Sequence, residues 1–160
     1  MPDMLVKLYE LPEPGPLNAG VRGAGVEVRR ALAPEKHHVI DWVRQSFGEG
    51  WASECDTAFA RQPVSCFIAT EDGACIGFAC YEATCRDFFG PTGVAEAARG
   101  RGIGKALLLA SLQAMRAEGY AYAIIGGAGP TEFYARAVGA VAIEGSSPGI
   151  YRGMLRPPAD

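Results

Sequence analysis

Apolar and polar residues follow two different periods in the first third of the chain, and these periods predict strands and helices. The opening MLVKLYEL and the later VEVRRAL both predict strands, and VEVRRAL alternates apolar with charged residues as a half-buried strand does. The segment LPEPGPLNAGVRGAG between them is rich in proline and glycine, which is typical of a loop or linker. The apolar residues of APEKHHVIDWVRQSF fall on one helical stripe, and WASECDTAFAR predicts a second short helix.

A β-hairpin is predicted in the middle of the chain. VSCFIAT and ACIGFACYE are rich in β-forming residues, and the turn tripeptide EDG separates them. DFFGPTGV predicts a further strand, which its glycines and proline should distort into a bulge or bend. From Gly102 to about Glu118, apolar residues recur at three- and four-residue steps, which predicts a helix.

The last third of the chain continues the alternation of strands and helices. YAIIGG predicts a short buried strand, and PTEFYARAV predicts a short helix. AVAIEG and GIYRGML are expected to close the chain as two strands. The predicted fold class is therefore a mixed α/β domain, and 160 residues are enough for one such domain with one core.

Composition and charge exclude several classes of protein. Hydrophobic residues make up 49% of the chain, so a packed core is expected and disorder is not. A net charge of -3 argues against a nucleic-acid partner, because such proteins normally carry a basic face. The N-terminus lacks a secretory signal pattern, and no apolar run approaches the ~20 residues of a membrane span. We expect a cytoplasmic protein with no membrane partner.

Cysteine is the residue type that most often suggests a metal site or a disulfide framework. The chain has five cysteines, which are Cys55, Cys66, Cys75, Cys80 and Cys85. They form no CxxC pair, and the two histidines, His37 and His38, are adjacent in the sequence. This spacing indicates neither a zinc site nor a disulfide framework. We therefore expect no metal, and free thiols that pack as small hydrophobic side chains.

The segment EAARGRGIGKALLLA, residues 96–110, is a glycine-rich turn ahead of a helix. Segments of this kind often bind phosphate, although some only turn the chain from a strand into a helix. The nucleotide P-loop pattern fails here for two reasons. Arg99 stands where its first glycine is required, and Ala106 replaces the hydroxyl that would bind magnesium.

The dinucleotide-binding pattern G-x-G-x-x-G fails as well. Its last glycine would have to stand at Lys105 or at Leu107. The sequence GGAG at 126–129 does not complete the pattern either, because Glu132 occupies the position of the third glycine. What remains at 99–104 is the spacing R-x-x-G-x-G, preceded by a predicted strand and followed by an amphipathic helix.

This spacing resembles the GNAT superfamily of acetyl-CoA-dependent N-acetyltransferases. The resemblance covers about residues 26–155, and EFYARAVGAVAIE is similar to the later family motif in which a helical Phe-Tyr precedes a glycine and a strand. It implies a mixed, mostly antiparallel sheet that is splayed between two parallel strands and flanked by helices. It also divides the chain into an N-terminal extension at 1–25, a strand plus a Pro/Gly-rich loop, and a GNAT domain at 26–160.

The resemblance implies acetyl-CoA as the co-substrate. Its pantetheine arm would pair with one of the two splayed strands, which here are the strand that ends at Val94 and the strand at 121–126. Backbone N–H groups and the helix N-terminus would hold the pyrophosphate, and the N–H near Val94 would stabilise the oxyanion. The expected cofactor-binding residues are Val94, Arg99, Gly100, Arg101, Gly102, Ile103, Gly104, Lys105 and Ala106.

Two residues are expected to be catalytic on the basis of the resemblance. Tyr134 matches the family tyrosine that protonates the coenzyme A thiolate, and a phenol with a pKa of about 10 suits that step. The alternative is that Tyr134 and Phe133 only pack the helix against the sheet. Asp87 stands near the start of the strand before the glycine turn, where many family members carry a carboxylate that acts as a base. Glu82, at the end of the preceding strand, is a second candidate base, and the alternative for either residue is a solvated hairpin charge.

The early helices and the last hairpin are implied to form the acceptor pocket. The expected substrate-binding residues are Trp51, Glu54 and Glu82, with Tyr81 as a further candidate. Glu54 would favour a cationic amine, and Trp51 could stack on it. The alternative for Trp51 is core packing.

The leading hypothesis is transfer of an acetyl group from acetyl-CoA to a primary amine by direct attack in a ternary complex. The acceptor would be a small molecule or an amino-terminal group. One alternative is a non-catalytic domain of the same fold that binds or senses acyl-CoA. Another is an interaction module, with a homodimer built on an exposed C-terminal strand. The sequence does not identify the acceptor, because one scaffold of this kind serves many amines.

Overall fold

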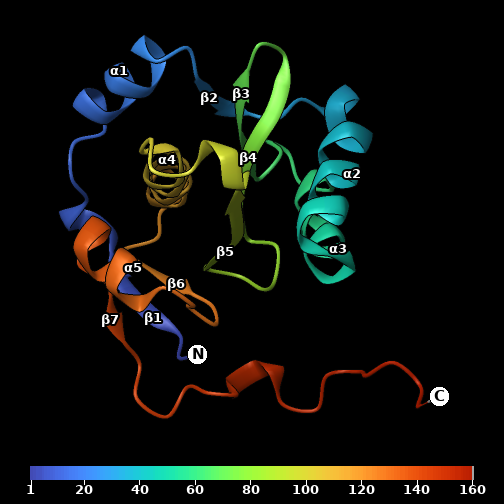
Figure 1. Cartoon of the computed structure of the whole chain (residues 1–160). Coiled ribbons are helices and arrows are strands. Elements are labelled where there is room, and N and C mark those ends of the chain that lie inside the picture. Colours follow the sequence, from blue (N-terminus) through green and yellow to red (C-terminus); the bar gives the residue numbers. More distant parts are fainter. Residues whose placement is uncertain (160) are drawn as a thin grey trace.

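A seven-stranded sheet forms the centre of the computed structural model, which describes residues 1–159 (Figure 1). The strands are β1 (Met4–Lys7), β2 (Glu27–Arg30), β3 (Cys66–Glu71), β4 (Ala74–Tyr81), β5 (Phe88–Val94), β6 (Tyr122–Ile125) and β7 (Val141–Ala142). Their order across the sheet is β2-β3-β4-β5-β6-β1-β7. Only β5 and β6 pair in parallel, and the other neighbouring strands pair antiparallel. The expected mixed, mostly antiparallel sheet is confirmed.

Helices cover both faces of this sheet. They are α1 (Gly15–Gly23), α2 (Lys36–Phe47), α3 (Glu49–Phe59), α4 (Ile103–Ala117) and α5 (Thr131–Val138). Helices α2 and α3 lie together on one face, and α4 lies on the other face, where α1 packs against it (Figure 1). The result is a three-layer α/β arrangement around two cores.

The alternation of side chains along the central strands explains why there are two cores. Successive residues of a strand point to opposite faces of the sheet. The residues of β3 and β4 that face α2 and α3 are Cys66, Ile68, Phe78 and Cys80. Those that face α4 are Phe67, Ala69, Ala79 and Tyr81. Because both faces are covered, both sets can be apolar.

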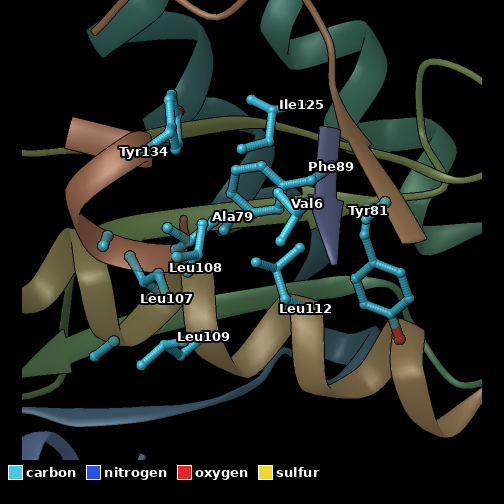
Figure 2. Packing of buried hydrophobic residues seen from close by; sticks show 14 of the residues in the cluster. Val6, Ala79, Tyr81, Phe89, Leu107, Leu108, Leu109, Leu112, Ile125 and Tyr134 are labelled. Carbon is cyan, nitrogen blue, oxygen red and sulfur yellow. The ribbon is translucent and has the colours of Figure 1, made fainter. Parts of the chain in front are cut away.

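Helix α4 carries the larger of the two cores. Its buried residues include Leu107, Leu108 and Leu112, which pack with strand residues such as Val6 and Phe89 (Figure 2). Helix α1 covers a further side of α4, so α4 is apolar around most of its circumference. This burial fixes the position of the helix that follows the glycine turn.

Two predictions from the sequence are wrong. The Pro/Gly-rich segment expected to be a loop contains α1, in which Val21 is buried and Leu17 packs against the core. Pro16 stands in the first turn, where proline is compatible with a helix. The closing segment GIYRGML is not a strand, because it begins with a 3₁₀-helix at Gly149–Tyr151 and continues without regular structure. In α1, contacts with the core outweigh local composition, whereas Ile150, Met154 and Leu155 of the closing segment are exposed.

The N-terminal residues are part of the sheet. Strand β1 pairs with β6 on one side and with β7 on the other. Just before it, the Asp3 carbonyl accepts a hydrogen bond from the Ile143 N–H (2.8 Å), and the Asp3 N–H donates to Ser146 Oγ (2.8 Å). The segment predicted to be an N-terminal extension therefore supplies a strand and a helix to the fold.

Replacing Leu112 with alanine should destabilise the protein by about 2 to 5 kcal/mol, because a fully buried side chain would leave a cavity between α4 and the sheet. Urea denaturation followed by circular dichroism measures this change. Leu155→Ala is the control, since that side chain is fully exposed and its loss should cost less than about 0.5 kcal/mol. Equal effects of the two substitutions would contradict the described packing of α4.

Candidate active site

The parallel pairing of β5 with β6 ends after two residue pairs. Phe88 pairs with Ile124 and Phe89 with Ile125, after which β6 ends while β5 continues along β4 to Val94. Within residues 1–159, no strand pairs with the β6-facing edge of β5 beyond this point, so that edge has no strand partner there. The expected separation of two parallel strands is confirmed.

The separation opens a cleft of about 570 Å³ at the carboxyl ends of β5 and β6. Residues 89–94 of β5 and Gly104 of α4 line one wall. Residues 125–130 and the side chains of Phe133 and Tyr134 line the other. Parts of α3, the β4–β5 turn and the C-terminal segment complete the lining. The cleft therefore joins the free edge of β5, the glycine turn and α5.

The glycine turn leads directly into α4 at the edge of the cleft. Gly100 and Gly102 have φ angles of 78° and 77°, a left-handed conformation that glycine adopts without strain. The helix begins at Ile103, and the first intrahelical bond runs from the Ala106 N–H to the Gly102 carbonyl. The N–H groups at 103–105 precede that bond, so the helix provides no acceptor for them, as is general for the first turn of a helix.

The basic residues of the turn differ in how they are engaged. Arg99 Nε lies 3.4 Å from the Val94 carbonyl oxygen and donates to it. The Arg101 guanidinium donates to both carboxylate oxygens of Glu71, at 3.2 and 2.5 Å, and this contact lowers the pKa of Glu71. Lys105 lines a hollow beside α5 and forms no ion pair within the described part of the chain. Lys105 and the terminal nitrogens of Arg99 are therefore less engaged than the Arg101 guanidinium, which is ion-paired with Glu71.

Tyr134 projects from α5 into the cleft lining. Its side chain is buried against Phe89, with ring centroids 6.3 Å apart in an edge-to-face arrangement (Figure 2). Burial raises the pKa of Tyr134 to about 12. No residue between 1 and 159 hydrogen-bonds to its hydroxyl, which is therefore free to donate to a ligand. The ring also packs in the core. The position of Tyr134 is therefore compatible with the expected role as a proton donor and with the alternative, packing of the helix against the sheet.

Two of the three expected substrate-binding residues line the cleft. Trp51 and Glu54 lie on α3, and the Trp51 ring packs against Phe47 with a centroid distance of 5.1 Å while remaining partly exposed. The Glu54 carboxylate accepts a hydrogen bond of 2.5 Å from the Thr84 hydroxyl. Glu54 is the only acidic or basic side chain in the cleft lining formed by the described residues. The cleft thus has a negative end and an apolar body.

The other two expected acids do not line the cleft. Glu82 and Asp87 lie in the turn between β4 and β5, where the Asp87 N–H donates to Glu82 Oε1 (2.6 Å). The Asp87 carbonyl accepts a hydrogen bond from the Ile124 N–H (2.9 Å), which holds the closed end of the strand pair. Burial, together with the nearby Glu82 carboxylate, raises the pKa of Asp87 to about 6. Tyr81, the further candidate, is also outside the lining, and its hydroxyl accepts a hydrogen bond from Arg30.

Two residues that line the cleft near Glu54 were not expected from the sequence. Thr84 and Tyr151 both line it, and the C-terminal segment brings Tyr151 there from a position predicted to be a strand. A Cβ atom placed on Gly126 would lie 2.7 Å from the Tyr151 hydroxyl oxygen, so this glycine permits the close approach. Burial and the neighbouring Glu54 raise the pKa of Tyr151. No local sequence signal marks either residue, because only the tertiary fold brings them together.

Comparison with known proteins identifies the family. The Acetyltransferase (GNAT) family profile matches residues 36–139, which is well over half of the chain. The chain therefore belongs to the GNAT acetyltransferase family, and the resemblance inferred from the glycine turn is confirmed. A search among curated proteins gives no match.

Solved structures show the same fold. The GCN5-related glucosamine N-acetyltransferase region of a fungal multi-domain GH3 β-N-acetylglucosaminidase matches with a TM-score of 0.73 and 16% identity, over 89% of this chain and 19% of that one. A GCN5-related N-acetyltransferase from Sphaerobacter thermophilus matches with a TM-score of 0.62 and 19% identity, over 89% of this chain and 48% of that one. A GCN5-related N-acetyltransferase from Kribbella flavida matches with a TM-score of 0.59 and 20% identity, over 88% of this chain and 53% of that one. This chain thus spans about half, or less, of the length of these relatives.

Within residues 1–159, no helix is both long enough and apolar enough to cross a bilayer.

Replacing Asp87 with asparagine should change how stability depends on pH. A pKa of about 6, above the usual value of about 3.9, means that the native state binds more protons than the unfolded state between about pH 4 and 6. This carboxylate therefore makes the free energy of unfolding fall as pH rises through that window. Relative to wild type, Asp87→Asn should gain stability across it, as measured by urea denaturation at several pH values.

The backbone should tolerate this substitution, because asparagine accepts the φ angle of 65° at this position. Asp72→Asn is the control for replacing an aspartate in a left-handed turn, since Asp72 has a φ angle of 51° and lies exposed in the β3–β4 hairpin. Parallel stability curves for wild type and Asp87→Asn would contradict the described environment of Asp87.

Proposed function

We propose that this protein transfers an acetyl group from acetyl-CoA to a primary amine, by direct attack of the amine within a ternary complex. The observation that carries this proposal is the cleft between β5 and β6, because it brings the glycine turn, Tyr134 and Glu54 to one opening. Membership of the GNAT acetyltransferase family supports the same reaction class.

The donor would bind along the β5 wall of the cleft. The pantetheine arm carries amide groups, which can hydrogen-bond to the unpaired backbone edge of β5 between Gly90 and Val94. The pyrophosphate would then reach the N–H groups at 103–105, with Lys105 as a counter-charge. Arg101 could bind the pyrophosphate only after its ion pair with Glu71 breaks. We therefore assign Arg101 a smaller share of the binding free energy than Lys105.

The reaction forms one bond to the carbonyl carbon and breaks another. The uncharged amine nitrogen attacks the thioester carbonyl, the C–N bond forms and the C–S bond breaks. The nitrogen gives up one N–H proton and the leaving thiolate takes up one proton, so an amine and a thioester become an amide and a thiol. The backbone N–H at Val94 is the proposed donor to the oxyanion, because it belongs to the unpaired edge of β5. These steps need no group other than the two substrates and the side chains of the cleft.

Tyr134 is the proposed donor to the leaving sulfur. A pKa of about 12 keeps its hydroxyl protonated throughout the neutral range, so it is always able to donate a hydrogen bond. Its buried ring holds the hydroxyl in one place against Phe89, which reduces the reorganisation needed during the reaction.

Glu54 is the proposed recognition group for the acceptor. As the one charged side chain in the described cleft lining, it would attract an ammonium ion and receive its proton before attack. The Thr84 hydroxyl fixes this carboxylate, and Trp51 offers an aromatic face to a cation. The expectation that Asp87 acts as the base stays a prediction, since its carboxylate lies outside the cleft lining.

Coenzyme A should raise the melting temperature of the protein, because a ligand that binds only the native state stabilises it by mass action. Acetyl-CoA should then release free thiol in the presence of an amine from a panel that includes glucosamine, because one structural relative is a glucosamine N-acetyltransferase region. Lys105→Ala should reduce the thermal shift. Lys7→Ala, which removes a surface lysine paired with Glu10, is the matched control and should leave it unchanged.

The outcomes of this experiment separate the candidate functions. A thermal shift with no thiol release for any amine would identify a binding or sensing domain and contradict the proposed transfer. If coenzyme A produced no shift at millimolar concentration, acetyl-CoA would be wrong as the donor.

Tyr134→Phe should lower kcat by about 100-fold or more, because it removes the proton donor for the leaving thiolate. The shift in melting temperature caused by coenzyme A should be retained, since the ring and its packing remain. Tyr120→Phe is the matched control, because Tyr120 is a half-buried tyrosine outside the cleft. An unchanged kcat for Tyr134→Phe would exclude Tyr134 as the donor.

A further inference from the structure

Three cysteine side chains meet in the core between the sheet and helices α2 and α3. Cys55 comes from α3, Cys66 from β3 and Cys80 from β4, and all three are fully buried. Their sulfur atoms all lie within 4.8 Å of one another, and all three thiols are free. Cys66 and Cys80 are direct partners in the β3–β4 pairing, so the sheet fixes two of the three positions. The cluster is separate from the cleft, because none of the three residues lines it.

The spacing of the sulfurs suits an ion with three ligands. Sulfur atoms placed about 2.3 Å from a central ion in a trigonal arrangement lie about 4 Å apart, using the length of a zinc–thiolate bond. The three sulfur atoms, all within 4.8 Å of one another, are therefore close enough to share one central atom after a small closing movement, which a pyramidal centre requires more than a planar one. No fourth His, Cys, Asp or Glu ligand atom joins the group within residues 1–159. A tetrahedral zinc site would thus be incomplete.

The surroundings of the cluster limit the charge that it can hold. The neighbouring side chains of the same core are apolar and include Ala52, Ala58 and Phe78, and this buried core contains no Lys, Arg or His. Three thiolates around a monovalent or divalent ion would leave a net negative charge in this dry region, which is costly. Three thiolates around a trivalent ion form a neutral complex. Thiolates also select soft ions.

We propose that Cys55, Cys66 and Cys80 form a binding site for a trivalent thiophilic metalloid, with arsenic(III) as its representative. Arsenic(III) exists in neutral water as the uncharged hydroxide As(OH)₃, which can enter an apolar core without the desolvation cost of an ion. On binding, three As–S bonds form and three As–O bonds break. Each thiol proton leaves with one hydroxide as water, and no atom changes its oxidation state.

The position of Cys55 gives this site a consequence for α3. Cys55 directly follows Glu54, and Trp51 lies one helical turn earlier on the same helix. A bound trivalent centre would join α3 covalently to β3 and β4. It would restrict the helix that places Glu54 and Trp51 in the cleft, although binding itself does not depend on the proposed acetyl transfer.

The test uses the full chain with Cys75 and Cys85 both replaced by alanine, so that only the three clustered thiols remain. The reduced protein is unfolded and refolded with arsenite and a phosphine reductant, which avoids both competing thiols and the barrier of a closed core. Native mass spectrometry should show one arsenic per chain with the loss of three hydrogens. The melting temperature should rise relative to protein refolded without arsenite.

Single substitutions in the cluster provide the matched comparison. Cys55→Ala, Cys66→Ala and Cys80→Ala should each abolish the adduct that lacks three hydrogens, and Cys55→Ser serves if an alanine variant fails to refold. Wild type, which retains Cys75 and Cys85, should bind one arsenic as the double variant does. Three results would each overturn the proposal. The refolded double variant could lack arsenic, its adduct could lack only two hydrogens, or Cys55→Ala could retain the full adduct.

Discussion

The parting of β5 from β6 is the constraint on which the rest of the site depends. Both strands pair through Phe89 and Ile125, and then β6 gives way to a run of small residues while β4 continues to hold β5. Gly126 begins that run with a Phe88 ring carbon and the Tyr151 hydroxyl both 2.7 Å from where its Cβ would lie. A larger residue there would displace one of these groups. The opening is therefore fixed by backbone pairing on one side and by a tight contact on the other.

Packing of α4 turns this opening into an ordered site. The helix lies between the sheet and α1, so the turn at its N-terminus is held from several directions. A Cβ on Gly104 would be 3.7 Å from a Val94 side-chain carbon, which shows how closely the start of the helix approaches the end of β5. The end of β5 and the start of α4 consequently line the cleft side by side, in positions set by the packing of the fold.

The glycine-turn part of the candidate site could be predicted from the sequence, whereas the part around Glu54 could not. The glycine turn is one contiguous segment with a strand before it and an amphipathic helix after it, and local patterns report such features well. Glu54, Thr84 and Tyr151 come from three distant segments, and no pattern within any one of them indicates the others. Asp87 is expected near the reaction from its place in the sequence, but it lies at the closed end of the strand pair, outside the cleft lining. The cysteine cluster is invisible in the sequence for a similar reason, since its members belong to three elements.

The place of β1 in the sheet has a consequence for the order of folding. Residues 4–7 are made well before their partners at 122–125 and 141–142. During synthesis β1 has no strand partner until residues 122–125 have left the ribosome, so this half of the sheet closes through contacts of high sequence separation. The cleft wall beyond β6 is complete only after that closure. A chain interrupted before β6 could thus form the β2–β5 part of the sheet and the α2–α3 layer and still lack the site.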